Sequence, residues 1–285
     1  MVLESLINPM KAEREPWELF FIGLVYSSVA ILLSLWIFSD YASLVMVFLT
    51  VIACIPLIFN TIKMEEEKDL VIEKERLLLK EHGRAISFFV FLFLGIMLSI
   101  TLWYVLIPVL AELLPSVIPA DLHQNLFSIQ SETISGINDK MTGNTIQETG
   151  FLFKIFLNNF KVLLFCILFA FLYGAGAIFI LTWNASVIGV AIGNFILTHV
   201  SQGLPYINVT SLGILRYMIH GIPEIVAYFV AGLAGGIISV AVIRHDFGSK
   251  KFEHILLDST DLIIISVVLL FFAAIIEVYI TPILF

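Results

Sequence analysis

Two ionisable residues stand inside one of the most apolar stretches of the sequence. His220 and Glu224 lie in the segment MIHGIPEIVAYFVAGLAGG, which runs from Met218 to Gly236 and carries Pro223 between them. A histidine and a carboxylate four residues apart share one face of a helix, where they can hydrogen-bond, bind an ion or relay a proton. Two ligands do not complete a zinc site, which takes three or four. A structural network, proton or ion handling, and metal binding are therefore three alternative interpretations.

Asparagines mark a second segment that can supply partners for this pair. Asn158 and Asn159 stand at the start of the fourth apolar run, and Asn184 stands at its other end. Amide side chains bond across helices inside a membrane, so packing is the first interpretation and substrate contact the second. His220 lies about one turn inside its own run, at the depth of Asn158 and Asn159. We therefore expect the fourth and sixth runs to be neighbours, with this amide pair facing His220 and Glu224.

Glycines in the same half of the chain are spaced for close contact between helices. Small residues four apart let two backbones approach, and the same pattern serves packing within one chain or between copies. The candidate packing glycines are Gly174, Gly176, Gly189, Gly193, Gly232 and Gly236.

The composition is that of a membrane protein. Hydrophobic residues make up 60% of the 285, charged residues make up 13%, and the mean hydropathy is +1.03. The formal net charge is -8 with no basic stripe, which argues against nucleic acid as a partner. Cys54 and Cys166 sit in apolar runs without metal-ligand spacing. We assign no catalytic residue, no metal and no cofactor, and we favour a protein that is not an enzyme.

The elements that must position these residues are apolar runs of about 20 residues, the length that spans a bilayer as a helix. They predict an all-α fold, a polytopic membrane helical bundle of about seven transmembrane helices. The fifth run, SVIGVAIGNFILTHV, is short at 15 residues and predicts a tilted or partly re-entrant helix. The predicted spans are 17–38, 42–62, 85–110, 155–183 (or from 151), 186–200, 214–243 and 262–280.

The polar segments between the runs divide the chain into three parts. Residues 1–111 contain the first helical hairpin, a charged segment at 63–84 and the third span. Residues 112–150 predict an extracytoplasmic loop, and residues 151–285 predict a Gly- and Asn-rich helical core. The charged segment is interpreted as a helix in water or at the membrane interface, with a solvated face or, alternatively, a docking role.

Lysine and arginine predict the orientation. Cationic residues concentrate before the first span, between the second and third spans, and between the sixth and seventh, whereas 112–150 holds only Lys140. By the positive-inside rule this places the N-terminus in the cytoplasm and, with seven spans, the C-terminus outside. The predicted location is the cell membrane, with the lipid bilayer as one partner.

Three motifs in the second half resemble a known family. They are NNFKV at 158–162, YGAGAIFILTWNASVIGVAIG at 173–193 and HGIPEIVAYFVAGLAGG at 220–236. Together they resemble the stage II sporulation protein M family over about residues 151–243. His220, Glu224, Asn158 and Asn159 match family positions, while Asn184-Ala185 stands where many members have Asn-Gly. The resemblance implies a membrane anchor and scaffold, because the namesake assembles with peptidoglycan-degrading proteins during engulfment.

Three functions from different classes follow. The first is a non-enzymatic scaffold or assembly protein of the cell envelope that associates with its own copies or with other membrane proteins. The second is a transporter or channel component that uses the buried polar cluster, with a separately encoded ATPase. The third is an intramembrane hydrolase, which the absence of HExxH, GxSxG and paired intramembrane aspartates disfavours.

Overall fold

The computed structural model describes residues 15–72, 75–119, 121–142, 148–244 and 248–284, and their regular elements are all helical. In chain order they are α3 (Glu18–Ile37), η1 (Ser39–Tyr41), α4 (Ala42–Val71), α5 (Glu75–Leu113), α6 (Leu122–Leu126), α7 (Ser128–Thr142), α8 (Glu148–Tyr173), α9 (Ala177–Ser201), α10 (Tyr206–Arg244), α11 (Lys250–Ile275), the π-helical turn η2 (Ile276–Ile280) and α12 (Thr281–Leu284).

Seven of these segments are long and apolar enough to cross a membrane, which confirms the predicted all-α membrane bundle. They contain α3, α4, α5, α8, α9, α10 and α11. α5 and α10 have 39 residues each, or about 58 Å at 1.5 Å per residue, against a hydrocarbon layer of about 30 Å. Both helices must therefore tilt or project beyond the lipid.

The boundary between the fourth and fifth spans differs from the predicted one. α8 ends at Tyr173, and α9 starts at Ala177 and is 25 residues long, so the fifth span is a full-length helix and not a short one. Gly174 adopts a φ of +64° at the break, a conformation that favours glycine after a helix end. Hydropathy does not register this break, because the sequence stays apolar on both sides of it.

The charged segment 63–84 also differs from the prediction of a separate helix. Its first part continues α4 to Val71 and its second part belongs to α5, so the two charged ends form one antiparallel pair. Glu65, Glu66, Asp69 and His82 are each at most 1% exposed, so this segment does not present a fully solvated face. We call this part of the molecule the charged end.

The segment predicted as a loop, 112–150, contains helices α6 and α7. Gln130 on α7 is fully buried and holds the segment to the bundle. Its Oε1 accepts from Ser43 Oγ at 2.7 Å, and its Nε2 donates to the Ser43 carbonyl at 3.2 Å and to Ser186 Oγ at 3.4 Å. These hydrogen bonds hold α7 against the start of α4, at Ser43, and against the middle of α9, at Ser186.

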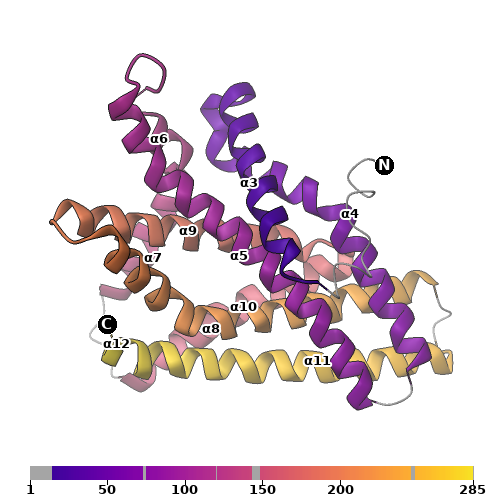
Figure 1. The fold of residues 1–285 in the computed structure, drawn as a ribbon. Coiled ribbons are helices and arrows are strands. Elements are labelled where there is room, and N and C mark those ends of the chain that lie inside the picture. The colour runs from indigo at the N-terminus through magenta and orange to yellow at the C-terminus, as the bar shows by residue number, and fades with distance from the viewer. Residues whose placement is uncertain (1–14, 73–74, 120, 143–147, 245–247, 285) are drawn as a thin grey trace.

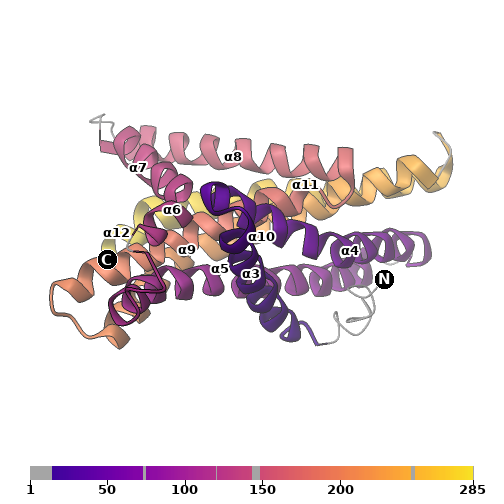
Figure 2. The same cartoon turned by 90° about the horizontal axis from the view of Figure 1, so that it is seen from above.

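The sixth span is the centre of the bundle. In its most apolar stretch 83% of α10 is buried, against 22% for both α8 and α11. α10 packs most extensively on α11 and α8, as predicted for the fourth and sixth spans, and also on α9, α4 and α5. In both views the C-terminal ends of α4 and α10 lie at one end of the bundle, α7 and α12 lie at the other, and α3 stands at a steep angle to α11 (Figures 1 and 2).

Candidate functional site

The intramembrane pair predicted from sequence belongs to a larger polar group. Tyr228 is 1% exposed, and its hydroxyl donates to Glu224 Oε1 at 2.7 Å. His220, Glu224 and Tyr228 follow one another four residues apart, so they form one polar stripe on α10. A buried tyrosine hydroxyl needs an acceptor, and Glu224 supplies it within the same helix.

The C-terminal helices complete the group. His220 Nδ1 lies 3.3 Å from Thr281 Oγ1, and Glu277 lies near enough to Glu224 for their charges to interact. Glu277 is in the π turn η2, where the Thr281 hydroxyl donates to the Ile276 carbonyl five residues back at 3.2 Å. π turns occur often at functional sites. We call His220, Glu224, Tyr228, Glu277 and Thr281 the C-terminal polar cluster.

The cluster contains two carboxyls, one imidazole and two hydroxyls. Groups of these types can exchange protons or interact with a small cation. Within the described residues no three His, Cys, Asp or Glu side chains are grouped to hold a metal ion. Sequence reasoning did not select Glu277 or Thr281. The available signal was an acidic residue near the end of the last apolar run, which is rare in a membrane span.

The asparagines lie apart from this cluster. Asn158 on α8 is exposed and Asn159 is half-buried, whereas Asn184 lies within α9 and donates to the Ile180 carbonyl at 2.8 Å. Among the described side chains, no hydrogen bond joins these asparagines to His220 or Glu224. Tyr228 and Thr281 take the place that the sequence assigned to the amides.

Changes at Glu224 and Tyr228 should separate a hydrogen-bonding role from a charge role. Tyr228→Phe removes the donor and Glu224→Leu leaves the buried hydroxyl unpaired, so each should cost about 1–3 kcal/mol. Glu224→Gln keeps an acceptor of the same shape and should stay near wild type. Thermal unfolding in detergent measures this, with Tyr173→Phe on the exposed end of α8 as a control. A fully stable Glu224→Leu protein would contradict the structural role.

The selected glycines occupy positions where a Cβ would meet a neighbouring helix or the chain bend. A Cβ at Gly189 would lie 2.9 Å from the Met97 carbonyl, and one at Gly193 would lie 2.6 Å from the Tyr104 ring. Gly232 faces Ala177 at 2.9 Å and Gly236 faces Ile62 at 2.9 Å, while Gly174 and Gly176 form the α8–α9 bend.

Two further glycines, Gly23 and Gly95, make the contact between α3 and α5. A Cβ at Gly23 would overlap the Leu92 carbonyl, and one at Gly95 would overlap the Phe20 carbonyl. This crossing lies in the first half of the chain. The expectation that the closest glycine contacts concentrate in residues 151–285 is therefore wrong, because Gly23 and Gly95 approach a neighbouring helix more closely than Gly189 or Gly232 does.

The charged end contains a second buried polar group. His82 Nδ1 lies 2.8 Å from Glu65 Oε2, and His82 Nε2 lies 3.0 Å from Asp69 Oδ1. Glu65 also accepts from Lys68 Nζ at 2.6 Å. With a carboxylate at each ring nitrogen, the arrangement favours an imidazolium that carries both protons. The sequence signal was the four-residue spacing of Glu65 and Asp69, which puts both on one helix face.

Arg244 joins the end of α10 to the same region. Its NH1 donates to Glu66 Oε2 at 2.7 Å and to Glu67 Oε1 at 3.1 Å. Arg244 is 178 positions from Glu66 and 177 positions from Glu67, so these contacts connect two helices that are far apart in the chain. They hold the ends of α4 and α10 together beyond the apolar core.

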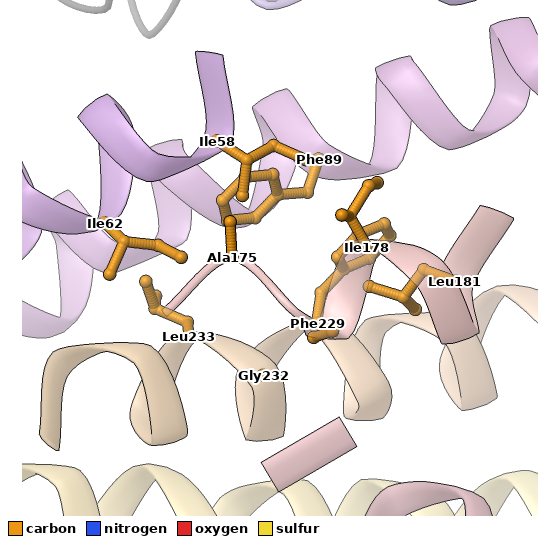
Figure 3. A pocket seen from close by; sticks show the side chains of 10 residues that line it. Ile58, Ile62, Phe89, Ala175, Ile178, Leu181, Phe229, Gly232 and Leu233 are labelled. Atoms are coloured by element: carbon orange, nitrogen blue, oxygen red, sulfur yellow. The ribbon is translucent and has the colours of Figure 1, made fainter. Parts of the chain in front are cut away.

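An apolar cavity lies where α4, α5, α9 and α10 meet, at the core of the bundle. Figure 3 shows that side chains from all four helices point into it. Its volume is about 20 Å³, close to the space that one water needs, but polar partners for a water are lacking in its walls. The lining residues are Ile58, Ile62, Phe89, Ala175, Ala177, Ile178, Leu181, Phe229, Gly232 and Leu233.

The fold and the site define a polytopic α-helical membrane protein with a buried central helix and polar groups at both ends. The family model described as stage II sporulation protein M matches residues 85–282, and the chain belongs to that family. The match begins in α5, earlier than the 151–243 region in which the sequence motifs were found. The third span is thus part of the family region.

One relative extends the comparison to archaea. An uncharacterized protein of Methanocaldococcus jannaschii is 34% identical over 158 residues, which is 54% of this chain and 84% of the relative. No solved structure matches the chain.

Proposed function

We propose that this protein is a non-enzymatic integral membrane scaffold of the cell envelope, which assembles with other membrane proteins or with its own copies. The enclosure of α10 in dry packing is the observation that carries this proposal. A solute path needs connected polar space, whereas the cavity at the core of the bundle, between α10 and helices α4, α5 and α9, is small and lined by apolar side chains. Membership of the stage II sporulation protein M family supports this proposal through the anchoring role that the resemblance implies.

The C-terminal polar cluster favours a second candidate, a transporter or channel component that handles protons or small cations. Glu224 and Glu277 are two carboxyls in an apolar setting, and intramembrane acids are functional candidates by default. Tyr228 and Thr281 satisfy part of the cluster from within the protein, as a structural network does. For this reason we rank transport second.

Reconstitution separates the two candidates. Purified protein in liposomes loaded with pH-sensitive or cation-sensitive dye should give no flux above empty liposomes. A photo-crosslinker at Val117, which is 72% exposed, should yield discrete crosslinked products in native membranes. Flux that Glu224→Gln abolishes would reject the scaffold and support transport. An absence of crosslinked products would count against assembly with a partner.

We also propose that the charged end faces the cytoplasm, from the positive-inside rule. Single cysteines at Val117 and Lys251, both exposed, should react with a membrane-impermeant maleimide from opposite sides. Native Cys54 and Cys166 are fully buried and should stay unlabelled, so the background is low. Labelling of both introduced cysteines from the same side would contradict this topology.

A further inference from the structure

A hollow of about 450 Å³ lies at the charged end, where the ends of α4 and α10 meet the α8–α9 bend. It is separate from the C-terminal polar cluster and shares none of its residues. Its walls combine apolar side chains with hydroxyls and cations. The lining residues are Phe59, Lys63, Leu172, Tyr173, Gly174, Ser239, Val240, Ile243 and Arg244.

The depth of the hollow corresponds to the border between hydrocarbon and headgroups. Lys63 directly follows the apolar stretch 42–62 of α4, and Arg244 is the last residue of α10. Tyr173, which is 69% exposed, is a residue type that concentrates at this border. The hollow therefore opens where lipid phosphates lie.

The apolar walls suit acyl chains. Phe59, Leu172 and Ile243 are 44%, 57% and 82% exposed, and they continue from the hollow onto the surface that faces lipid. An amphiphile can thus lay its tails along these side chains while its headgroup enters the hollow. Basic pockets between membrane helices are known binding places for lipid headgroups.

The polar groups suit one phosphate. Lys63 is exposed and has no ion pair within the described residues, whereas Arg244 is already held by Glu66 and Glu67. Ser239 is only 7% exposed, and its hydroxyl makes no hydrogen bond to the part of the chain that the structure describes. The hollow thus offers one uncommitted cation and one unpaired buried donor.

We propose that this hollow binds a membrane phospholipid. The lipid phosphate lies between the Lys63 ammonium and the Ser239 hydroxyl, and the acyl chains lie along Phe59, Leu172 and Ile243. A single uncommitted cation matches the single charge of a phosphodiester. A bound lipid would also brace the α8–α9 bend against α4 and α10.

Native mass spectrometry of delipidated protein, titrated with dioleoylphosphatidylglycerol, tests the proposal. One lipid should bind more tightly than the rest, and Lys63→Gln should weaken it about tenfold, the effect of one charged hydrogen bond. Ser239→Leu removes the hydroxyl that would donate to the phosphate and narrows the hollow, so it should weaken this tight site. Lys251→Gln, which removes an exposed charge from the same end of the bundle, should leave binding unchanged.

Two further probes identify the occupant. Dioleoylglycerol, which lacks the phosphate, should bind at least about tenfold more weakly than the phospholipid, and inorganic phosphate should not raise the melting temperature. Equal lipid binding by wild type, Lys63→Gln and Ser239→Leu would overturn the proposal, as would equal binding of dioleoylglycerol. A higher melting temperature of the protein in inorganic phosphate alone would contradict a lipid as the occupant. Because Lys63 is exposed, the Lys63→Gln protein should fold normally, so a loss of lipid binding in this variant cannot be attributed to misfolding.

Discussion

Replacing Gly95 with alanine is expected to be among the most destabilising single changes in this protein. The new Cβ would overlap the Phe20 carbonyl oxygen and lie 3.0 Å from the Leu24 nitrogen. Both are backbone atoms of α3, so no side chain can rotate away. Gly23 faces α5 in the same manner, and the two helices must move apart to accept a methyl group. We expect a loss of about 3 kcal/mol, measured by unfolding in detergent or graded denaturant.

Gly83 is a matched control in the same helix. A Cβ built there meets nothing within 4 Å, so Gly83→Ala should be neutral or stabilise α5 by about 0.5–1 kcal/mol. Subtracting the stability change of Gly83→Ala from that of Gly95→Ala removes the intrinsic difference in helix propensity between glycine and alanine. A Gly95→Ala protein as stable as Gly83→Ala would disprove the close crossing of α3 and α5.

Replacing His82 with leucine is the second change with a large expected effect. The imidazole lies between Glu65 and Asp69, and all three side chains are at most 2% exposed. Leucine would leave the buried Asp69 carboxylate facing an apolar group and repelling Glu65, which keeps its bond to Lys68. Breaking a buried ion pair in this way should cost about 3–5 kcal/mol. The measurement is again the stability of the detergent-solubilised protein.

The pH dependence of the deficit tests its electrostatic origin. Protonation removes the charge of an unpaired carboxylate, so the difference between His82→Leu and wild type should shrink at acid pH. Arg84→Gln is the control, because Arg84 is 50% exposed in its pair with Glu81 and should contribute less than about 1 kcal/mol. A deficit that does not change with pH would indicate lost packing instead of unpaired charge.

Hydropathy determined the class of the protein, because it is a sum over about 20 neighbouring residues and needs no knowledge of contacts. The seven spans, the all-helical fold and the family followed from the chain alone. The four-residue spacing of His220 and Glu224 likewise placed both on one stripe of α10, since helical periodicity is local. Helix ends were less predictable: the break at Gly174 lies within continuous apolar sequence and depends on one backbone conformation.

Partner choice was decided only by the tertiary structure. Glu224 meets Tyr228, and His220 meets Thr281, where the sequence suggested asparagines of α8. The sequence likewise showed charges at 63–84 without showing that His82 is enclosed by two of them. Such contacts depend on the rotation and crossing of helices that are far apart in the chain. Local composition sets which residues need a partner, and packing between helices sets which partner each one meets.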